Sequence, residues 1–265
     1  MQKIINAHCH IYPEKIADKA VEGIRKFYDL DMSLNGKVSD LIKDGSKVGV
    51  THYLIHSVAT TPKQVKSINE FIAETVNSHS DLFTGFGTLH PDSDDIQGDF
   101  DYLIELGLKG VKLHPDFQQF PMDSQRAFKI GEVVSEGQVP MLVHCGDFRY
   151  NYSNPDQLKP FLEKFPDITF IGAHFAGWSI WKEATEKLAG IPNLYVDLSS
   201  SLYDLSPQAA LDLIHAYGSD KVLWGTDYPM WDSVSEMEYF NKLDLTKKEK
   251  SQILYDNAAK ILGLI

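Results

Sequence analysis

The chain has 265 residues and a formal net charge of −12, with 43% hydrophobic and 23% charged residues. An acidic surface repels phosphate groups, so we expect neither nucleic acid nor an anionic membrane surface as a partner. The sequence also has no apolar run near the roughly 20 residues of a membrane span and no signal-peptide pattern at its start, which predicts a cytoplasmic protein.

Eight short apolar segments alternate with amphipathic segments along the chain. They are rich in Val, Ile, Leu and Phe, a composition that is typical of strands buried on both faces. The predicted strands are Ile4–His10, Thr51–Ala59, Phe83–His90, Gly110–His114, Pro140–His144, Thr169–His174, Asn193–Ser199 and Val222–Asp227.

The intervals between these strands carry helix patterns. The predicted helices are Pro13–Tyr28, Ser39–Val48, Pro62–Ser78, Asp99–Leu106, Ser124–Glu136, Pro155–Phe165, Trp178–Leu188, Pro207–Tyr217 and Thr246–Leu262. Ser39 is the expected N-cap of its helix, and Thr246 with Glu249 predicts a capping box. The segment 29–37 is predicted to be a loop that forms a flap over the first strand.

Strands that alternate with helices predict a parallel sheet, and eight such units favour a closed (β/α)8 barrel, the TIM barrel, over an open sheet. Because such barrels reach this length as one domain, we predict a single α/β domain over residues 1–265. Cys9 and Cys145 are expected to be buried free thiols rather than a disulfide.

Histidines gather at one end of the predicted strands. His8 and His10 lie two residues apart, so in a strand they share one face and supply half of a metal site. A pair of surface histidines on an edge strand would have the same pattern. Six of the ten histidines, however, lie at or near carboxyl ends of strands, where a barrel collects its catalytic groups. They are His8, His10, His90, His114, His144 and His174.

Asp227 lies at the carboxyl end of the eighth predicted strand. Together with His8, His10 and His144 it can supply the three or four nitrogen and oxygen ligands of a zinc-type catalytic site, with one position left for water. A carboxylate beside such a site has a second use, because it can hold or accept the proton of the water.

Five motifs follow one another at barrel spacing. They are HxH at 8–10, GVKLHP at 110–115, VHCG at 143–146, GAHFAG at 172–177 and GTDYP at 225–229. In this order they resemble the amidohydrolase superfamily, and most closely its amidohydrolase-2 branch, which also contains decarboxylases of the aminocarboxymuconate semialdehyde type. The resemblance extends from His8 to Pro229 and implies a metal-dependent enzyme.

The resemblance also implies roles for matching residues. It makes four of them ligands of one divalent metal ion, for which we expect zinc: His8, His10, His144 and Asp227. His174 matches a histidine that acts on the water or the substrate, so His174 and Asp227 are the expected catalytic groups. In binuclear members a carboxylated lysine bridges two metals and this histidine becomes a ligand. Lys112 and His174 match that arrangement, which we keep as the alternative.

Three further residues are candidates for substrate binding. Lys112 and His114 share one face of their strand, and packing explains His114 equally well. Arg149 is one of three arginines and follows His144 in a loop, where a guanidinium can bind a substrate carboxylate through two parallel hydrogen bonds. An ion pair with a nearby acid is the competing interpretation.

We therefore predict a metal-dependent hydrolase that acts on an amide, lactone or ester carbonyl of a small molecule. If Arg149 binds substrate, that substrate carries a carboxylate. Non-oxidative decarboxylation of a small carboxylic acid is the alternative, because the motifs serve both chemistries. A barrel that binds a metal and a ligand without catalysis is the third interpretation. A homodimer is left open.

Overall fold

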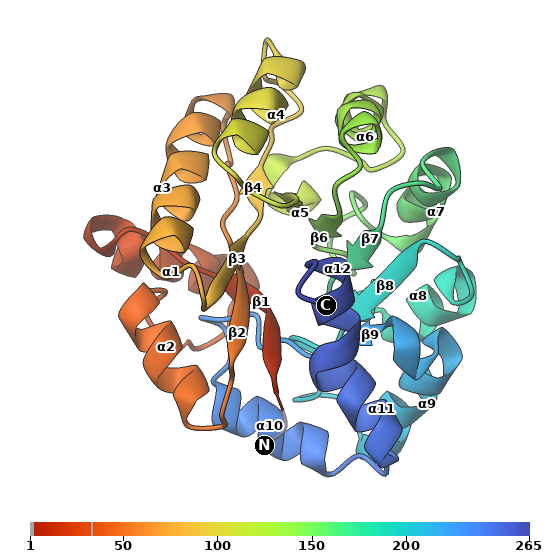
Figure 1. Ribbon diagram of the computed structural model, residues 1–265. Coiled ribbons are helices and arrows are strands. Elements are labelled where there is room, and N and C mark those ends of the chain that lie inside the picture. Colours follow the sequence, from red (N-terminus) through yellow and green to blue (C-terminus); the bar gives the residue numbers. More distant parts are fainter. Residues whose placement is uncertain (1–2, 33) are drawn as a thin grey trace.

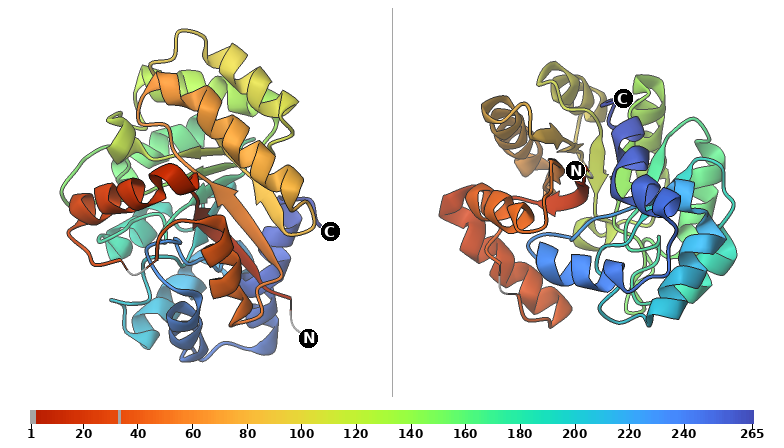
Figure 2. Two further views of the ribbon diagram at one scale, coloured as in Figure 1. Left: turned by 90° about the vertical axis from the view of Figure 1, so that its left-hand side faces the viewer. Right: turned by 60° about the horizontal axis from the view of Figure 1, so that its bottom comes forward.

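The computed structural model describes residues 3–32 and 34–265 (Figure 1). Parallel strands form the centre of the molecule, and the helices lie around them on the outside (Figure 2). The strands are β1 (Ile5–His10), β2 (His52–His56), β3 (Phe83–Gly85), β4 (Gly87–Thr88), β5 (Val111–Leu113), β6 (Met141–Val143), β7 (Phe170–Gly172), β8 (Leu194–Asp197) and β9 (Val222–Leu223).

The strand predicted at 83–90 is interrupted at Phe86, which separates β3 from β4. β3 pairs with β2, and β4 pairs with β5. The amide of Phe86 donates to the oxygen of Ile55, and the amide of Gly87 donates to the oxygen of Gly110. The segment 83–88 therefore pairs with β2 through its first half and with β5 through its second half, and so connects the two sheets.

The first and last strands are also joined. The amide of Ala7 donates to the oxygen of Trp224 at 2.9 Å, and the amide of His10 donates to the oxygen of Tyr228 at 2.7 Å. A parallel bridge pairs Cys9 with Tyr228. These contacts link β1 to the chain around β9, as a closed barrel requires, and the predicted (β/α)8 barrel is confirmed.

The helices follow the order that the sequence predicts, with additions. They are α1 (Glu14–Tyr28), α2 (Val38–Ser46), α3 (Val65–Ser78), α4 (Ile96–Glu105), α5 (Pro115–Gln118), α6 (Gln125–Gly137), α7 (Pro155–Lys164), α8 (Trp181–Leu188), α9 (Pro207–Tyr217), α10 (Ser233–Asn241), α11 (Lys247–Ser251) and α12 (Asn257–Ile261). Short 3₁₀ turns cover Pro62–Gln64 and Ser219–Lys221, and a π-helical turn at Gln252–Asp256 joins α11 to α12. None of these helices has the length and apolar character that crossing a bilayer requires, in the part of the chain that the structure describes.

Some helix starts agree with local capping chemistry. Ser124 caps α6 by accepting from the amide of Ala127, and Thr246 forms the predicted capping box with Glu249. The prediction for Ser39 is wrong, because α2 already begins at Val38. The side chain of Asn35 accepts from the amide of Lys37 and turns the chain before that point.

The sequence analysis did not predict α10. Asp232 caps this helix by accepting from two amides of its first turn. Its inner face includes Glu236, which is fully buried. This residue interrupts the apolar stripe by which an amphipathic helix is predicted. The four-residue helix α5, which follows β5 directly, was also missed.

The barrel interior has its own apolar cluster, separate from the larger core between the strands and the helices. Its members include Ile5, Leu54, Phe86, Leu142, Ile171 and Leu223, together with Ala258 and Ala259 of α12. In Figure 1 the last helix lies over the middle of the ring. The amino end of the barrel is thus apolar and covered by α12. Cys9 and Cys145 are buried free thiols, as predicted.

The predicted flap at 29–37 includes residue 33, which lies outside the described residues. The described remainder contains no helix or strand. The oxygen of Gly36 accepts from the amide of Tyr12, and the oxygen of Lys37 accepts from the hydroxyl of Tyr228. This loop is therefore held against the segments that follow β1 and β9, near the carboxyl end of the barrel.

Candidate metal centre and active site

Side chains that the sequence singled out come together inside the carboxyl end of the barrel. They are buried, apart from the side chain of Asp227, which is 12% exposed. They come from the ends of five strands: His8 and His10 from β1, Lys112 from β5, His144 after β6, His174 after β7 and Asp227 after β9.

His8, His10 and Asp227 form a triangle of donor atoms. The two Nε2 atoms of His8 and His10 are 3.3 Å apart. Asp227 Oδ1 lies 3.2 Å from His8 Nε2 and 3.4 Å from His10 Nε2. Tetrahedral ligands at about 2.0–2.2 Å from a divalent ion lie roughly 3.3–3.6 Å from one another. The three atoms therefore have the spacing that one ion requires.

His8 is oriented by a residue that the sequence analysis did not predict. Its Nδ1–H donates to Oδ2 of the buried Asp197 at 2.9 Å, which leaves the Nε2 lone pair directed at the triangle. Burial opposes ionisation of Asp197, but His8, His174 and Ser199 outweigh that effect and hold its pKa at about 2. Asp197 is therefore an ionised carboxylate that fixes the tautomer of a candidate ligand.

His144 and His174 face one another with two lone pairs. His174 Nδ1–H donates to the oxygen of Ser199 at 2.9 Å, and His144 Nε2–H donates to the oxygen of Gly146 at 3.1 Å. The remaining nitrogens, His174 Nε2 and His144 Nδ1, are 3.1 Å apart. Burial lowers the pKa of both rings, so both are neutral. A cation between or beside them would relieve this contact.

Asp227 connects the two groups of donors. Its Oδ2 lies 4.0 Å from His174 Nε2 and accepts from the hydroxyl of Ser200 at 2.7 Å. Trp231 in turn donates to the hydroxyl of Ser200 at 2.9 Å. Burial opposes ionisation of Asp227, but His8, His10 and His174 outweigh it and hold its pKa well below the usual range.

The backbone is strained where two of these side chains enter the site. His174 and Asp227 have φ of 60° and 54°, a left-handed conformation that non-glycine residues adopt rarely. His174 lies two residues after β7, and Asp227 lies four residues after β9. Such strain is retained where the surrounding structure fixes it, often at functional sites.

Lys112 and His114 occupy different environments although they share a strand face. The amine of Lys112 donates to His8 Nε2 at 3.1 Å, and burial lowers its pKa to about 8. His114 lies flat on His144, with ring centres 3.9 Å apart, and its Nε2 bonds the hydroxyl of Tyr28 at 2.9 Å. Lys112 is thus part of the donor cluster, and His114 supports His144 from outside.

Arg149 lies in the loop after β6, where its guanidinium is held by the buried Asp147. Two of its nitrogens contact that carboxylate at 2.9 Å and 2.7 Å, and the third donates to the oxygen of Phe27 at 2.7 Å. This is the ion pair that competed with the substrate role in the sequence analysis. The role of Arg149 as a carboxylate anchor stays a prediction.

Two cavities reach the cluster, and His10 lines both. The larger has a volume of about 770 Å³ and lies between α1 and the chain from β2 to α3, with mostly apolar walls that include Tyr12, Ile24 and Phe27. The smaller, of about 20 Å³, is bounded among others by Tyr28 of α1, by Met32 of the predicted flap, and by His10, His114, His144 and Asp227.

A family model described as Amidohydrolase matches residues 5–264. The chain belongs to the amidohydrolase family. None of the curated proteins matches this chain in sequence. An uncharacterized TIM-barrel protein from Bordetella bronchiseptica has a similar structure, with a TM-score of 0.82, 20% identity and 98% of each chain covered.

Two further solved structures carry different activities in their names. A dihydroxybenzoic acid decarboxylase from Polaromonas, with bound manganese and the inhibitor 2-nitroresorcinol, has a TM-score of 0.76 at 16% identity, over 100% of this chain and 98% of the other. A probable 2-pyrone-4,6-dicarboxylic acid hydrolase from Acinetobacter baumannii, with citric acid bound, has a TM-score of 0.71 at 16% identity, over 98% and 99%. At these identities the likeness establishes the fold of the amidohydrolase.

Sequence reasoning missed several residues of this amidohydrolase cluster. His56 ends β2 and Asp197 ends β8, but the predicted strands ran on to Ala59 and Ser199, which placed both residues in mid-strand. Ser200 carried no signal of its own. A search for every histidine or acid within a few residues of a strand end would have found His56 and Asp197.

Proposed function

We propose that this chain is a metal-dependent hydrolase that acts on the amide, lactone or ester carbonyl of a small molecule. One observation carries the proposal: His8 Nε2, His10 Nε2 and the ionised Asp227 carboxylate converge in a buried triangle with the spacing of ligands around one ion. The single-ion assignment of the ligands His8, His10, His144 and Asp227 belongs to this proposal.

The donor set fits a divalent ion. Imidazole nitrogen with one carboxylate oxygen suits zinc better than calcium or magnesium. Asp197 acts from behind His8, because a carboxylate on the other ring nitrogen raises the basicity of a ligand. A bound ion of this kind polarises a carbonyl group and makes water a stronger nucleophile at neutral pH. We expect zinc.

His174 would handle the proton. The oxygen of Ser199 holds its Nδ1–H, so Nε2 is the free basic atom and lies 4.0 Å from Asp227 Oδ2. Burial keeps the ring neutral before reaction, which is the state a general base needs. In the proposed cycle Nε2 accepts a proton as water attacks and returns it to the leaving group.

The larger cavity suggests the kind of substrate. Its walls are mostly apolar, and His10 brings it to the donor cluster. A substrate with a hydrophobic body and a reacting carbonyl group would place that group at His10 and the body between α1 and α3. A substrate carboxylate would need a cation, for which Lys112 and Arg149 are the candidates.

Decarboxylation of a small carboxylic acid is the second candidate. Lys112 favours it, because a buried amine with a pKa of about 8 is mostly protonated at neutral pH and can hold a carboxylate beside His8. The decarboxylase named above also has this fold. In this version His174 Nε2 would first take up a proton from solvent water and then transfer it to the carbon from which carbon dioxide leaves.

A screen of metal-loaded protein separates the two candidates. Lactones, N-acyl compounds and aromatic or enoic carboxylic acids are supplied in turn, while acid release and carbon dioxide release are both recorded. The hydrolase proposal expects acid without carbon dioxide, activity that a chelator abolishes and that added zinc or manganese restores. Carbon dioxide as the product would replace it with the second candidate, and full activity after complete removal of metal would overturn both.

His52→Gln is the matched control variant for that screen. His52 is a buried histidine of β2 whose Nε2 bonds the hydroxyl of Thr84 at 2.9 Å, at the end of the strand away from the site. The variant should keep the activity of the wild type. Loss of activity in it would point to damage of the barrel rather than of the site.

A further inference from the structure

His56 is a buried histidine that neither the sequence motifs nor the proposed mechanism uses. It is the last residue of β2, and Leu54, two residues earlier, belongs to the apolar cluster inside the barrel. Because side chains two apart in a strand share a face, His56 faces the interior as well, one layer nearer to the carboxyl end.

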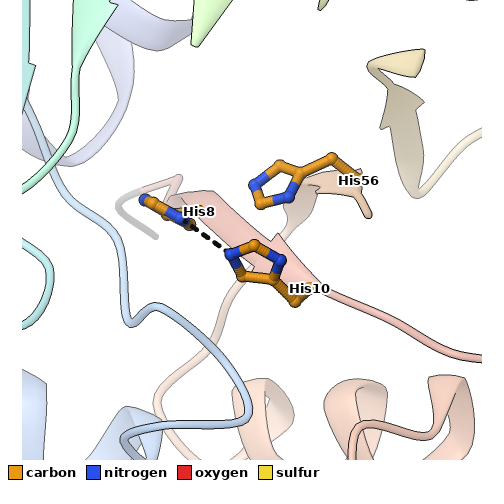
Figure 3. Close-up of side chains that lie close together, drawn as sticks. All are labelled: His8, His10 and His56. Carbon is orange, nitrogen blue, oxygen red and sulfur yellow. Dashed lines mark hydrogen bonds between the residues drawn. The ribbon is translucent and has the colours of Figure 1, made fainter. Parts of the chain in front are cut away.

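Strand pairing places His56 beside the histidines of β1. His10 and His56 are register partners in the parallel pair of β1 and β2. Their ring centres are 4.4 Å apart, and the centre of the His8 ring lies 4.9 Å from that of His56. Figure 3 shows the three rings gathered above the ends of the two strands.

Both ring nitrogens of His56 lack a hydrogen-bond partner within residues 3–32 and 34–265, although the residue is fully buried. Buried polar atoms are nearly always paired, so an imidazole with two unpaired nitrogens indicates a missing partner. His52, at the other end of the same strand, does have its partner in Thr84.

We propose that His56 is a further ligand of the ion that His8, His10 and Asp227 would hold. One nitrogen of each of the three histidines lies within 4.8 Å of the others, and the Nε2 atoms of His8 and His10 are 3.3 Å apart, the spacing of two ligands of one ion. This inference rests on the proposed metal-dependent function. Beside His8, His10 and His144 it would be the fourth imidazole, and such a set favours zinc, cobalt or nickel over ions that prefer oxygen ligands.

A role in substrate contact fits His56 less well. Its exposed fraction is zero, and the walls of the larger cavity are formed by the next residues, Ser57 and Val58, rather than by His56, in the described part of the chain. The atoms that its ring faces are those of His8 and His10. A ligand role uses that direction, and a substrate role does not.

Metal affinity tests this assignment without any substrate. Wild type, His56→Gln and the control His52→Gln are stripped of metal and titrated with zinc against a competing chelator, and the visible spectrum of the cobalt-loaded forms is recorded. The His56 variant should lose affinity by more than about tenfold, since even outer-shell partners of ligands contribute about 10–100-fold. Its cobalt spectrum should change in position or intensity, and the control should match the wild type in both.

The outcomes separate this inference from the function on which it rests. Unchanged affinity and spectrum in His56→Gln, with tight binding by the wild type, would overturn the role of His56 alone. Absence of binding in the wild type would overturn the metal-dependent function as well. If His56→Gln fails to fold, wild type labelled with ¹⁵N-histidine and loaded with ¹¹³Cd decides, because a ligand nitrogen shows scalar coupling to the metal and a merely adjacent one does not.

Discussion

The same strands form both ends of the barrel interior, but apolar side chains fill one end and titratable side chains fill the other. At the amino end Ile5, Leu54 and Leu223 fill the interior and α12 covers it. At the carboxyl end the same interior holds histidines, a lysine and two acids. The contrast is visible within β2. His52 at its amino end is hydrogen-bonded to Thr84, whereas His56 at its carboxyl end has no hydrogen-bond partner in the described residues. The amino end serves stability, and the carboxyl end tolerates unfavourable burial.

The pKa values at the carboxyl end report that unfavourable burial. Burial lowers the pKa of Lys112 to about 8 and of His10 to about 4. Groups with such shifts are destabilising when they must be charged, and they gather where proteins bind metals or substrates. The comparison therefore predicts that variants at the carboxyl end change chemistry, whereas variants at the amino end change stability.

The largest effect is expected for His8→Ala. His8 contacts His10, Lys112, Asp197 and Asp227, so no other side chain of the cluster can take its place. Elemental analysis should give about one divalent ion per chain for the wild type and almost none for the variant, with unchanged circular dichroism. Full retention of metal would contradict the ligand assignment. A wild-type content near two would favour the arrangement with a carboxylated Lys112.

His174→Asn should keep the metal and lose the reaction. Asparagine can still donate to the oxygen of Ser199 but cannot accept and return a proton, so kcat should fall by about 10²–10⁴. The pH–rate profile should lose one limb. Release of metal in proportion to lost activity would instead make His174 a ligand.

Leu54→Ala tests the amino end. The side chain is buried inside the barrel, and removal of buried leucine atoms typically costs about 2–5 kcal/mol. We expect a loss of that size in urea unfolding, with the metal content of the folded protein unchanged. Loss of metal from a fully folded variant would show that the two ends are not independent.

The smallest effect is expected for Glu236→Gln, outside the barrel. Burial raises the pKa of Glu236 well above its usual range, and neither carboxylate oxygen has a partner among the described residues. Its contribution to stability is therefore present below the unfolded pKa of about 4.3 and lost as pH rises toward the folded pKa. The variant should be more stable than the wild type at pH 8, by an amount on the order of 1 kcal/mol.

Urea unfolding of both proteins at several pH values checks this sign. The difference between them should shrink as the pH falls toward 4. A variant that is less stable than the wild type at pH 8 would mean that the carboxylate of Glu236 has a stabilising partner when ionised.

Much of this architecture could be predicted because it depends on local pattern. Buried strands appear as apolar runs, and His8 and His10 share a face whatever the rest of the chain does. The end of a strand is different, because it is set by where its neighbours stop pairing. That is why the predicted strands overran His56 and Asp197, and why the break at Phe86 was not expected.

The site also depends on contacts between distant parts of the chain. The tautomer of His8 is fixed by Asp197, and that of His174 by the oxygen of Ser199. Neither partner can be predicted from a motif, because each is distant in sequence and is brought close only by the fold of the barrel. For Arg149, position alone predicted a substrate group, whereas its neighbour Asp147 supplies an ion pair that the sequence could only offer as a competing interpretation.

The hydrogen bonds between β1 and the chain around β9 have a consequence for biosynthesis. His8 and His10 leave the ribosome well before Asp227 and the backbone of Trp224 and Tyr228. Until then β1 has an unpaired edge, the kind of surface on which nascent chains aggregate. We therefore expect ion capture to be delayed until the chain has been made beyond Tyr228, so that bound metal would mark a closed barrel.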